Sequence, residues 1–317
     1  MKIQANGLQI EVDVQGPPGG EPVLLVMGLG MQLVAWPDEL VAELVARGFR
    51  VIRFDNRDVG LSDGLDHLGM PRMLGAMLRY SLRLSVPAPY KLRDMADDAV
   101  GVLDALGIAA AHVCGASMGG MIAQQMAVRH PQRVKSLTLI MTTSGARHLP
   151  QPSLRVRQAL MARPRSTAVA DVVAHLEGLV HTIGSPGYRP EPARLRQRLE
   201  ASVRRAYRPA GTARQLLAIV ADGDRTPLLR QIRQPTRVIH GLDDPLVPVA
   251  AGRHLASEIA GATLDLVPGM GHDLPLALLP RIADGIAQGI AQGIAQGIAQ
   301  GFAQGDAQGD AQAASRA

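Results

Sequence analysis

The segment 115–119 constrains this chain more than any other part of its sequence. It reads Gly-Ala-Ser-Met-Gly and lies between the apolar run 112–114 and the helix-like run 120–126. A serine at the centre of Gly-x-Ser-x-Gly occupies a sharp, strained turn between a strand and a helix, which exposes its hydroxyl. Only residues without a Cβ fit beside such a turn, which accounts for Gly115 and Gly119. The sequence therefore predicts a strand, an exposed Ser117 and a helix, in that order.

Strand-like and helix-like runs alternate over the first 140 residues. Strands are expected at 10–14, 23–26, 51–54, from 113 and at 137–140, and helices at 37–48 and at 94–107, the second capped by Asp94. Such alternation builds a mostly parallel sheet with helices on both faces. The alternation of strands and helices stops near residue 144 and resumes with a strand at 236–240.

We therefore predict an α/β fold in which the sheet is built in two parts. Residues 1–143 and 234–287 form the core, and residues 144–233, rich in proline and arginine, form an inserted helical lid. A second loop, 66–90, is expected to join the rim of the same site. The alternative for the insertion is an independent binding domain.

The C-terminal segment 288–317 belongs to a low-complexity repeat. From Gly285 the chain repeats Gly-Ile-Ala-Gln, and the last helix of the fold is expected from Pro280 to about Ala287. A glycine in every fourth position costs about 1 kcal/mol each relative to alanine, so a frayed helix or disorder is expected beyond. The isoleucines could serve self-association, or the repeat could be an expansion without a role.

Composition excludes several classes of protein. Aromatic residues make up only 3% of the chain, which argues against a stacking surface for nucleic acid. No apolar run approaches the roughly 20 residues of a membrane span, and the N-terminus lacks an apolar leader. The single cysteine, Cys114, fits a reducing cytoplasm. We expect a cytoplasmic protein without nucleic-acid partners, and the sequence leaves the oligomeric state open.

The net charge of +5 comes mostly from arginine, because 30 of the 33 basic residues are arginine and only three are lysine. A basic patch could mean an acidic partner. No nucleic-acid motif accompanies the charge, so we favour a compositional preference with solvated helix faces.

Ser117 can act as a nucleophile only if a base removes its hydroxyl proton. A histidine can serve as that base when a carboxylate fixes the tautomer of its ring. Of the nine histidines, His272 alone follows a strand in a glycine-rich loop, residues 268–272, and comes after a candidate acid. The acid is Asp243 or Asp244, which are adjacent and follow the strand ending at His240. The pattern His-Gly-x-x-Asp followed by Val-Pro favours Asp244.

Two backbone N–H groups are needed to bind a developing oxyanion. One is expected from Met118, directly after the serine, and the other from Leu29 in the turn Gly-Leu-Gly at 28–30. The methionines near these motifs either line an apolar pocket or pack in the core. They are Met27, Met31, Met118, Met121 and Met270.

These motifs together resemble the α/β-hydrolase superfamily, serine carboxylesterase type, over about residues 5–285. The runs 27–30, 54–62 and 269–275 are similar to a bacterial ester-hydrolase group that includes aclacinomycin methylesterase. The resemblance implies that the Asp-Arg turn after the strand 51–54 is structural. The chain departs from many members of this group at Met27, where they have histidine. The resemblance implies an α/β-hydrolase fold and hydrolysis of an ester.

The sequence thus predicts a serine hydrolase that cleaves the carboxylic ester of a small, apolar substrate through an acyl-enzyme. The same residues also serve lactonases, amidases or peptidases, carbon–carbon hydrolases and perhydrolases. A ligand-binding relative without activity is the alternative from another class. Dehalogenases and epoxide hydrolases have aspartate at the position of Ser117, so the serine here disfavours both activities. No metal or cofactor motif is present in the sequence, and none is expected.

Overall fold

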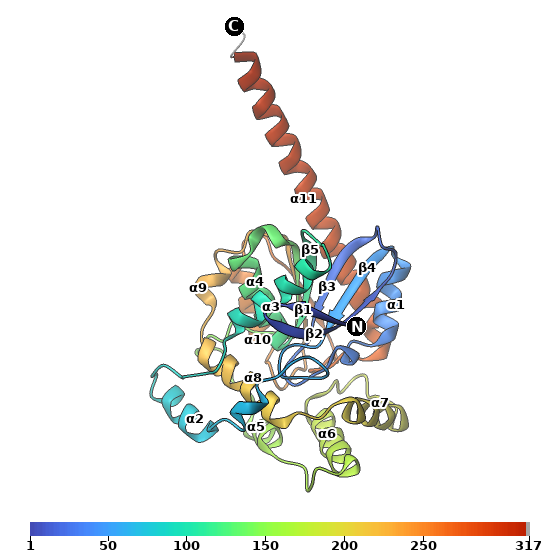
Figure 1. Ribbon diagram of the computed structural model, residues 1–317, viewed down its shortest axis with the longest axis vertical. Coiled ribbons are helices and arrows are strands. Elements are labelled where there is room, and N and C mark those ends of the chain that lie inside the picture. The colour runs from blue at the N-terminus through green and yellow to red at the C-terminus, as the bar shows by residue number, and fades with distance from the viewer. Residues whose placement is uncertain (315–317) are drawn as a thin grey trace.

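A computed structural model describes the backbone of residues 1–314 and the side chains of residues 1–296. Its centre is an eight-stranded sheet of order β1-β2-β4-β3-β5-β6-β7-β8 (Figure 1). The strands are β1 (Lys2–Ala5), β2 (Leu8–Gln15), β3 (Glu21–Val26), β4 (Phe49–Phe54), β5 (Ala111–Ala116), β6 (Val134–Ile140), β7 (Thr236–Gly241) and β8 (Thr263–Val267). In this order, the strands from β4 to β8 pair in parallel. The two antiparallel pairs, β1–β2 and β2–β4, lie at one edge of the sheet. The predicted α/β class is confirmed.

The edge strand β1 is absent from the sequence-based prediction. It has four residues, three of them at least partly exposed, so it lacks the apolar run that marks the inner strands. Its hairpin with β2 turns at Asn6 and Gly7, both with positive φ, a pair suited to a tight connection.

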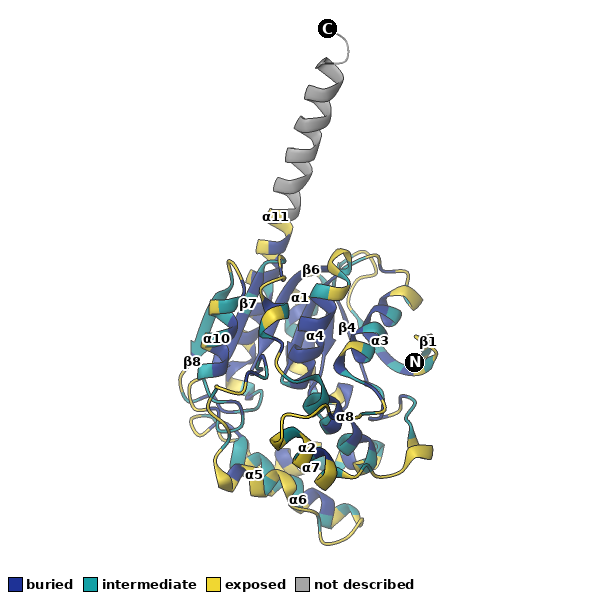
Figure 2. Cartoon of the chain, turned by 90° about the vertical axis from the view of Figure 1, so that its left-hand side faces the viewer, coloured by how far each residue is buried: buried dark blue, intermediate teal, exposed yellow. Residues whose placement is uncertain are grey.

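Helices cover both faces of the sheet, as the alternation predicts (Figure 2). Helices α1 (Asp38–Ala46) and α11 (Leu279–Ala314) pack on one face, in an apolar cluster that includes Trp36, Leu40 and Ile282. Helices α3 (Leu92–Ala105), α4 (Met118–Arg129) and α10 (Ala250–Glu258) pack on the other face.

The prediction that Asp94 caps α3 is wrong by three residues. The helix begins at Leu92, and the cap position belongs to Lys91. The Asp94 carboxylate instead reaches back and accepts the Lys91 backbone N–H at 2.7 Å. An acid is favourable both at the cap, where it accepts an N–H group of the first turn, and at the third helical position, where it accepts the N–H of the cap residue, so the sequence alone does not separate the two.

Five helices lie between β6 and β7 in the chain, and no strand interrupts them. They are α5 (Leu154–Met161), α6 (Val169–Ile183), α7 (Pro192–Arg205), α8 (Pro209–Asp222) and α9 (Thr226–Leu229). Helices α5 to α8, with α2 (Met73–Ser81) from the loop after β4, gather at the end of the molecule opposite the outgoing α11 (Figure 1). That is where the carboxyl ends of the parallel strands lie, and ligands of open α/β sheets bind at this edge. We refer to α5–α8 as the cap.

Helix α11 follows the sheet further than the expected end near Ala287. Ile286 and Ile290 are buried, and a Cβ built on Gly293 would lie 2.9 Å from Ser136 Cβ. Glycine therefore lets the repeat approach the sheet closely, which offsets its low helix propensity. The contacts with the sheet thus extend about one and a half helical turns beyond the predicted end. The predictions for the repeat from residue 297 onward concern side chains outside the described residues.

Stability is expected to depend on pH through His112, which is buried in β5. Burial lowers the pKa of His112 to about 4, although Glu21 nearby favours its charged form. Between pH 6.5 and pH 4 the unfolded chain then binds more protons at this residue, so the free energy of unfolding falls as the pH falls. Urea unfolding across this range checks the prediction. His112→Gln should flatten the profile, and an unchanged slope would contradict it.

Candidate active site

Ser117 occupies a strained turn between β5 and α4. Its backbone has φ 54° and ψ −120°, a left-handed conformation that non-glycine residues rarely adopt. A Cβ on Gly119 would lie 1.9 Å from the Val26 carbonyl oxygen, and one on Gly115 would lie 2.3 Å from the Gly119 oxygen. No other residue type fits at either position, so these two glycines make the turn possible.

The ring of His272 lies between Ser117 and Asp244. His272 Nε2 is 3.0 Å from Ser117 Oγ, and His272 Nδ1 is 2.7 Å from Asp244 Oδ2. A carboxylate accepts only, so Nδ1 carries the proton and Nε2 can accept the serine proton. The three side chains predicted from separate motifs are therefore in hydrogen-bond contact.

The two adjacent acids have different partners. Asp244 is buried, and its second oxygen, Oδ1, accepts the backbone N–H groups of Leu246 and Val247 at 2.9 and 2.8 Å. Asp243 points elsewhere, and its Oδ2 accepts the Gly269 N–H at 2.8 Å. Asp244 thus faces the imidazole, while Asp243 fastens the start of the loop that carries it.

His240 supports the acid turn and does not face Ser117. Its ring is fully buried, and Nε2 lies 2.8 Å from the Val247 carbonyl oxygen, to which it can donate. Burial lowers the pKa of His240 below its ordinary value, which favours the neutral ring. This residue stabilises the turn whose N–H groups hold Asp244.

The turn 28–30 lies directly beside the serine. A Cβ on Gly28 would be 3.2 Å from Ser117 Cβ and 3.7 Å from its Oγ. Among the polar contacts of the described residues, neither the Leu29 N–H nor the Met118 N–H donates to another group. The Gly30 N–H, in contrast, is used: it donates to Gln215 Oε1 at 2.8 Å. The Leu29 N–H is therefore without an acceptor among the described residues.

Gln215, on cap helix α8, is a candidate positioning residue that the sequence reasoning missed. It is fully buried, and while Oε1 binds Gly30, its Nε2 donates to the Arg57 carbonyl at 2.8 Å. A polar residue on a buried helix face is a signal, but it does not reveal a partner 185 positions away in the chain.

A second cap segment holds the histidine loop. The Ile183 carbonyl accepts the His272 N–H at 2.8 Å, and Ser185 Oγ accepts the Gly271 N–H at 2.8 Å. The Ser185 hydroxyl in turn donates to Asp273, whose carboxyl pKa is raised by burial. The last residue of α6 and the segment that follows it thus hold the backbone of the loop that carries His272.

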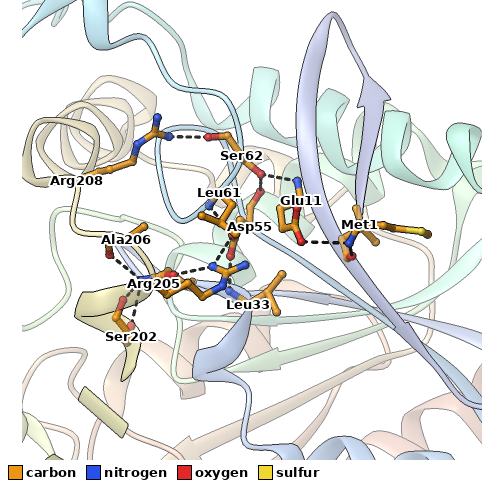
Figure 3. Close-up of polar contacts among 12 residues, drawn as sticks. Met1, Glu11, Leu33, Asp55, Leu61, Ser62, Ser202, Arg205, Ala206 and Arg208 are labelled. Carbon is orange, nitrogen blue, oxygen red and sulfur yellow. Dashed lines mark hydrogen bonds and ion pairs between the residues drawn. The ribbon is translucent and has the colours of Figure 1, made fainter. Parts of the chain in front are cut away.

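Two arginines at the α7–α8 junction attach the cap to the turn after β4 (Figure 3). Arg205 Nη1 donates to Asp55 Oδ2 at 2.7 Å, and Arg208 Nη1 donates to the Ser62 carbonyl at 2.6 Å. Asp55 is fully buried and also accepts the Leu33 N–H at 2.7 Å. The Asp-Arg turn is therefore a docking platform for the cap.

Gln215→Leu is expected to lower kcat about 10- to 100-fold on an ester, with a smaller change in KM. The substitution leaves the Gly30 N–H and the Arg57 carbonyl without partners, and displacing the turn 28–30 by a fraction of an ångström misplaces the Leu29 N–H. Steady-state kinetics check this, with the exposed Gln231→Leu as matched control. A stability loss with normal kcat would reduce Gln215 to a structural role.

The methionines near the motifs pack mostly in the core. Four of the five are buried in apolar clusters, and only Met31 is exposed: Met27, Met118, Met121 and Met270 are the buried ones. Among the described residues, no group of three or more potential metal ligands is present. In the same part of the chain, no helix is long and apolar enough to cross a bilayer.

Comparison with known proteins covers most of the chain. A family model described as alpha/beta hydrolase fold matches residues 21–276. The chain is 31% identical to the rhodomycin D methylesterase DauP of Streptomyces sp. (strain C5), over 86% of this chain and 91% of that protein. It is 30% identical to the 2-hydroxymuconate semialdehyde hydrolase of Pseudomonas sp. (strain CF600), over 86% of each. The enol-lactonase from Burkholderia xenovorans LB400 has the same fold, with a TM-score of 0.71, 22% identity and coverage of 92% of this chain and 100% of that one.

Proposed function

The chain belongs to the alpha/beta hydrolase fold family, and we propose that it is a serine hydrolase that cleaves the carboxylic ester of a small molecule. The observation that carries the proposal is the contact series from Asp244 through His272 to Ser117, with distances of 2.7 and 3.0 Å. The similar methylesterase supports an ester as the bond that is cleaved.

In the first half of the reaction, Ser117 Oγ attacks the ester carbonyl carbon. Its proton passes to His272 Nε2, and Asp244 stabilises the imidazolium. The carbonyl oxygen becomes an oxyanion and accepts the N–H groups of Leu29 and Met118, each worth about 2.7–4 kcal/mol of barrier. The carbon–oxygen bond to the alcohol then breaks, and His272 gives its proton to the departing alcohol oxygen.

In the second half, water replaces the alcohol. His272 takes a proton from water as the water oxygen attacks the acyl-enzyme carbonyl. The second tetrahedral species uses the same two N–H groups. When it collapses, the proton returns to Ser117 and the carboxylic acid is released.

The cap, within the predicted insertion 144–233, is proposed to set the choice of substrate. It covers the carboxyl ends of the strands, whereas the three reacting side chains come from the core. Carbon–carbon hydrolysis is a second candidate activity, because the similar semialdehyde hydrolase matches as much of the chain as the methylesterase does.

A substrate panel tests the proposal. We expect turnover of p-nitrophenyl and methyl esters, and mass spectrometry of the quenched enzyme should find an acyl group on Ser117. Lactones, amides and a meta-cleavage semialdehyde serve as competing substrates. Turnover of the semialdehyde alone would favour the second candidate. Thermal stabilisation by these compounds without turnover of any would indicate a binding protein.

The cytoplasm is our proposal for the place of action. Cys114 is the only cysteine of the chain and is fully buried, and burial raises its thiol pKa. A chain that uses neither disulfides nor an accessible thiol fits a reducing compartment.

A further inference from the structure

Two segments at the cap end present apolar side chains to solvent. They are residues 67–84, which contain α2, and residues 147–165, which contain α5, and we call them together the α2–α5 face. Leu74 is 88% exposed and Leu154 is 67% exposed. Further exposed side chains on this face are Leu68, Met70, Leu78, Leu82, Leu160 and Met161. Large apolar side chains gathered in this way mark an interaction surface.

The exposed leucines are not core residues that lack a packing partner, because each helix already packs its other side against the protein. Helix α2 already packs its other side, with Met73, Ala76 and Tyr80, against Leu217 and Val220 of α8. Helix α5 likewise buries Val156. The outward side chains therefore contribute little to folding, and their removal should leave the fold intact.

The two segments touch one another. Arg147 Nη2 donates to the Tyr80 carbonyl at 3.0 Å, and its guanidinium carbon lies 4.1 Å from the centre of the Tyr80 ring. Both segments lie at the end of the molecule opposite the outgoing α11 in two perpendicular views (Figures 1 and 2). The two segments therefore adjoin, at the end of the molecule where the cap lies.

The charge of this face has one sign. Residues 67–84 contain three arginines and residues 147–165 contain five, and neither range contains aspartate or glutamate. Among the described residues none of these eight arginines forms an ion pair. On the neighbouring α7, by contrast, arginines pair with acids, as Arg196 does with Glu177 at 2.8 Å. Two acids lie at the edges of this face: Asp66 pairs with Arg208 and Arg214 at 2.9 and 3.2 Å, and Asp224 lines a hollow of about 610 Å³ with Arg83, Arg147 and His148.

Unpaired arginines interleaved with exposed leucines fit one kind of partner best. A second copy of the same face would bring eight positive charges against eight. A nucleic acid would use the arginines but would leave the leucines in water. At the surface of an anionic bilayer, guanidinium groups meet lipid phosphates while leucines enter the acyl boundary. We propose that the α2–α5 face docks this protein onto anionic phospholipid bilayers, lying on the membrane without crossing it.

Co-sedimentation of the full chain with vesicles tests the proposal. Vesicles of phosphatidylcholine with phosphatidylglycerol should bind the protein, phosphatidylcholine alone should bind it weakly, and added salt should release it. Arg79→Gln with Arg83→Gln should lower the partition coefficient about 5-fold per arginine, from about 1 kcal/mol each. Leu74→Ser with Leu78→Ser should lower it at least as much.

Matched controls change the same residue types elsewhere. Arg196→Gln and Ile294→Ser alter an exposed arginine and an exposed apolar residue outside the face, and should bind vesicles like the wild type. The proposal would be wrong if the protein bound neither kind of vesicle, or if the face variants and the control variants lost vesicle binding equally. It would also be wrong if the only association found were a dimer that depends on the leucines, or binding to duplex DNA. The Ser117→Ala protein should bind equally well, so this test does not depend on the proposed hydrolysis.

Discussion

Ser117→Ala is expected to reduce kcat on a p-nitrophenyl ester by at least about 10⁴-fold and to abolish labelling by a fluorophosphonate. The alanine variant keeps the turn, the imidazole and the N–H donors, but it removes the atom that forms the bond to the acyl group. Enzymes of this type retain only the rate acceleration that binding and the oxyanion donors supply when the nucleophile is lost. Steady-state kinetics and gel fluorescence of the labelled protein measure the two effects.

The control for this variant is Ser257→Ala, which changes an exposed serine at the end of α10. It should keep both kcat and labelling. Labelling of the Ser117→Ala protein at the wild-type rate would show that the probe reacts elsewhere. The assignment of Ser117 as nucleophile would then be wrong.

Asp244→Asn is the second change with a large expected effect, a fall in kcat of about 10⁴-fold. The amide can still occupy the same space, but its NH₂ group would face His272 Nδ1 and favour the tautomer with the proton on Nε2. The imidazole could then no longer accept the serine proton. Labelling by the fluorophosphonate should slow in parallel, since it needs the same base.

Asp243→Asn provides a matched control one residue away. Its side-chain oxygen can still accept the Gly269 N–H, so kcat is expected to stay within about tenfold of the wild type. If the two variants exchanged their effects, Asp243 would be the acid. If both were near wild type, a carboxylate would not be orienting His272.

The core of the fold was predictable because its signals are local. The turn at Ser117 needs glycine on both sides, and the inner strands read as continuous apolar runs such as 23–26 and 137–140. The preference for Asp244 over Asp243 rested on the spacing of the acid turn. The structure places Asp244, and not Asp243, within hydrogen-bond distance of the His272 ring.

The attachment of the cap was not predictable, because its signals are not local. Gln215, Ser185 and Arg205 are ordinary polar residues in helices and loops, and each acquires its partner only when segments some 90 to 185 positions apart meet. The edge strand β1 was missed for a different reason, since its exposure leaves it without an apolar run. The extent of α11 on the sheet depends on glycines whose close contacts a propensity scale counts only as a cost.

Two of the attachments of the cap, which we call anchors, bear on how such an enzyme could acquire new substrates. The segment after α6 carries the support of His272, and α8 carries the support of the turn 28–30, so both travel with the insertion if it is exchanged for a foreign one. A transplanted cap would have to bring its own equivalents of Ser185 and Gln215, or the recipient would lose turnover whatever its pocket recognised. Diversification should therefore proceed by point changes and by loop insertions between these anchors, with the anchors themselves inherited unchanged.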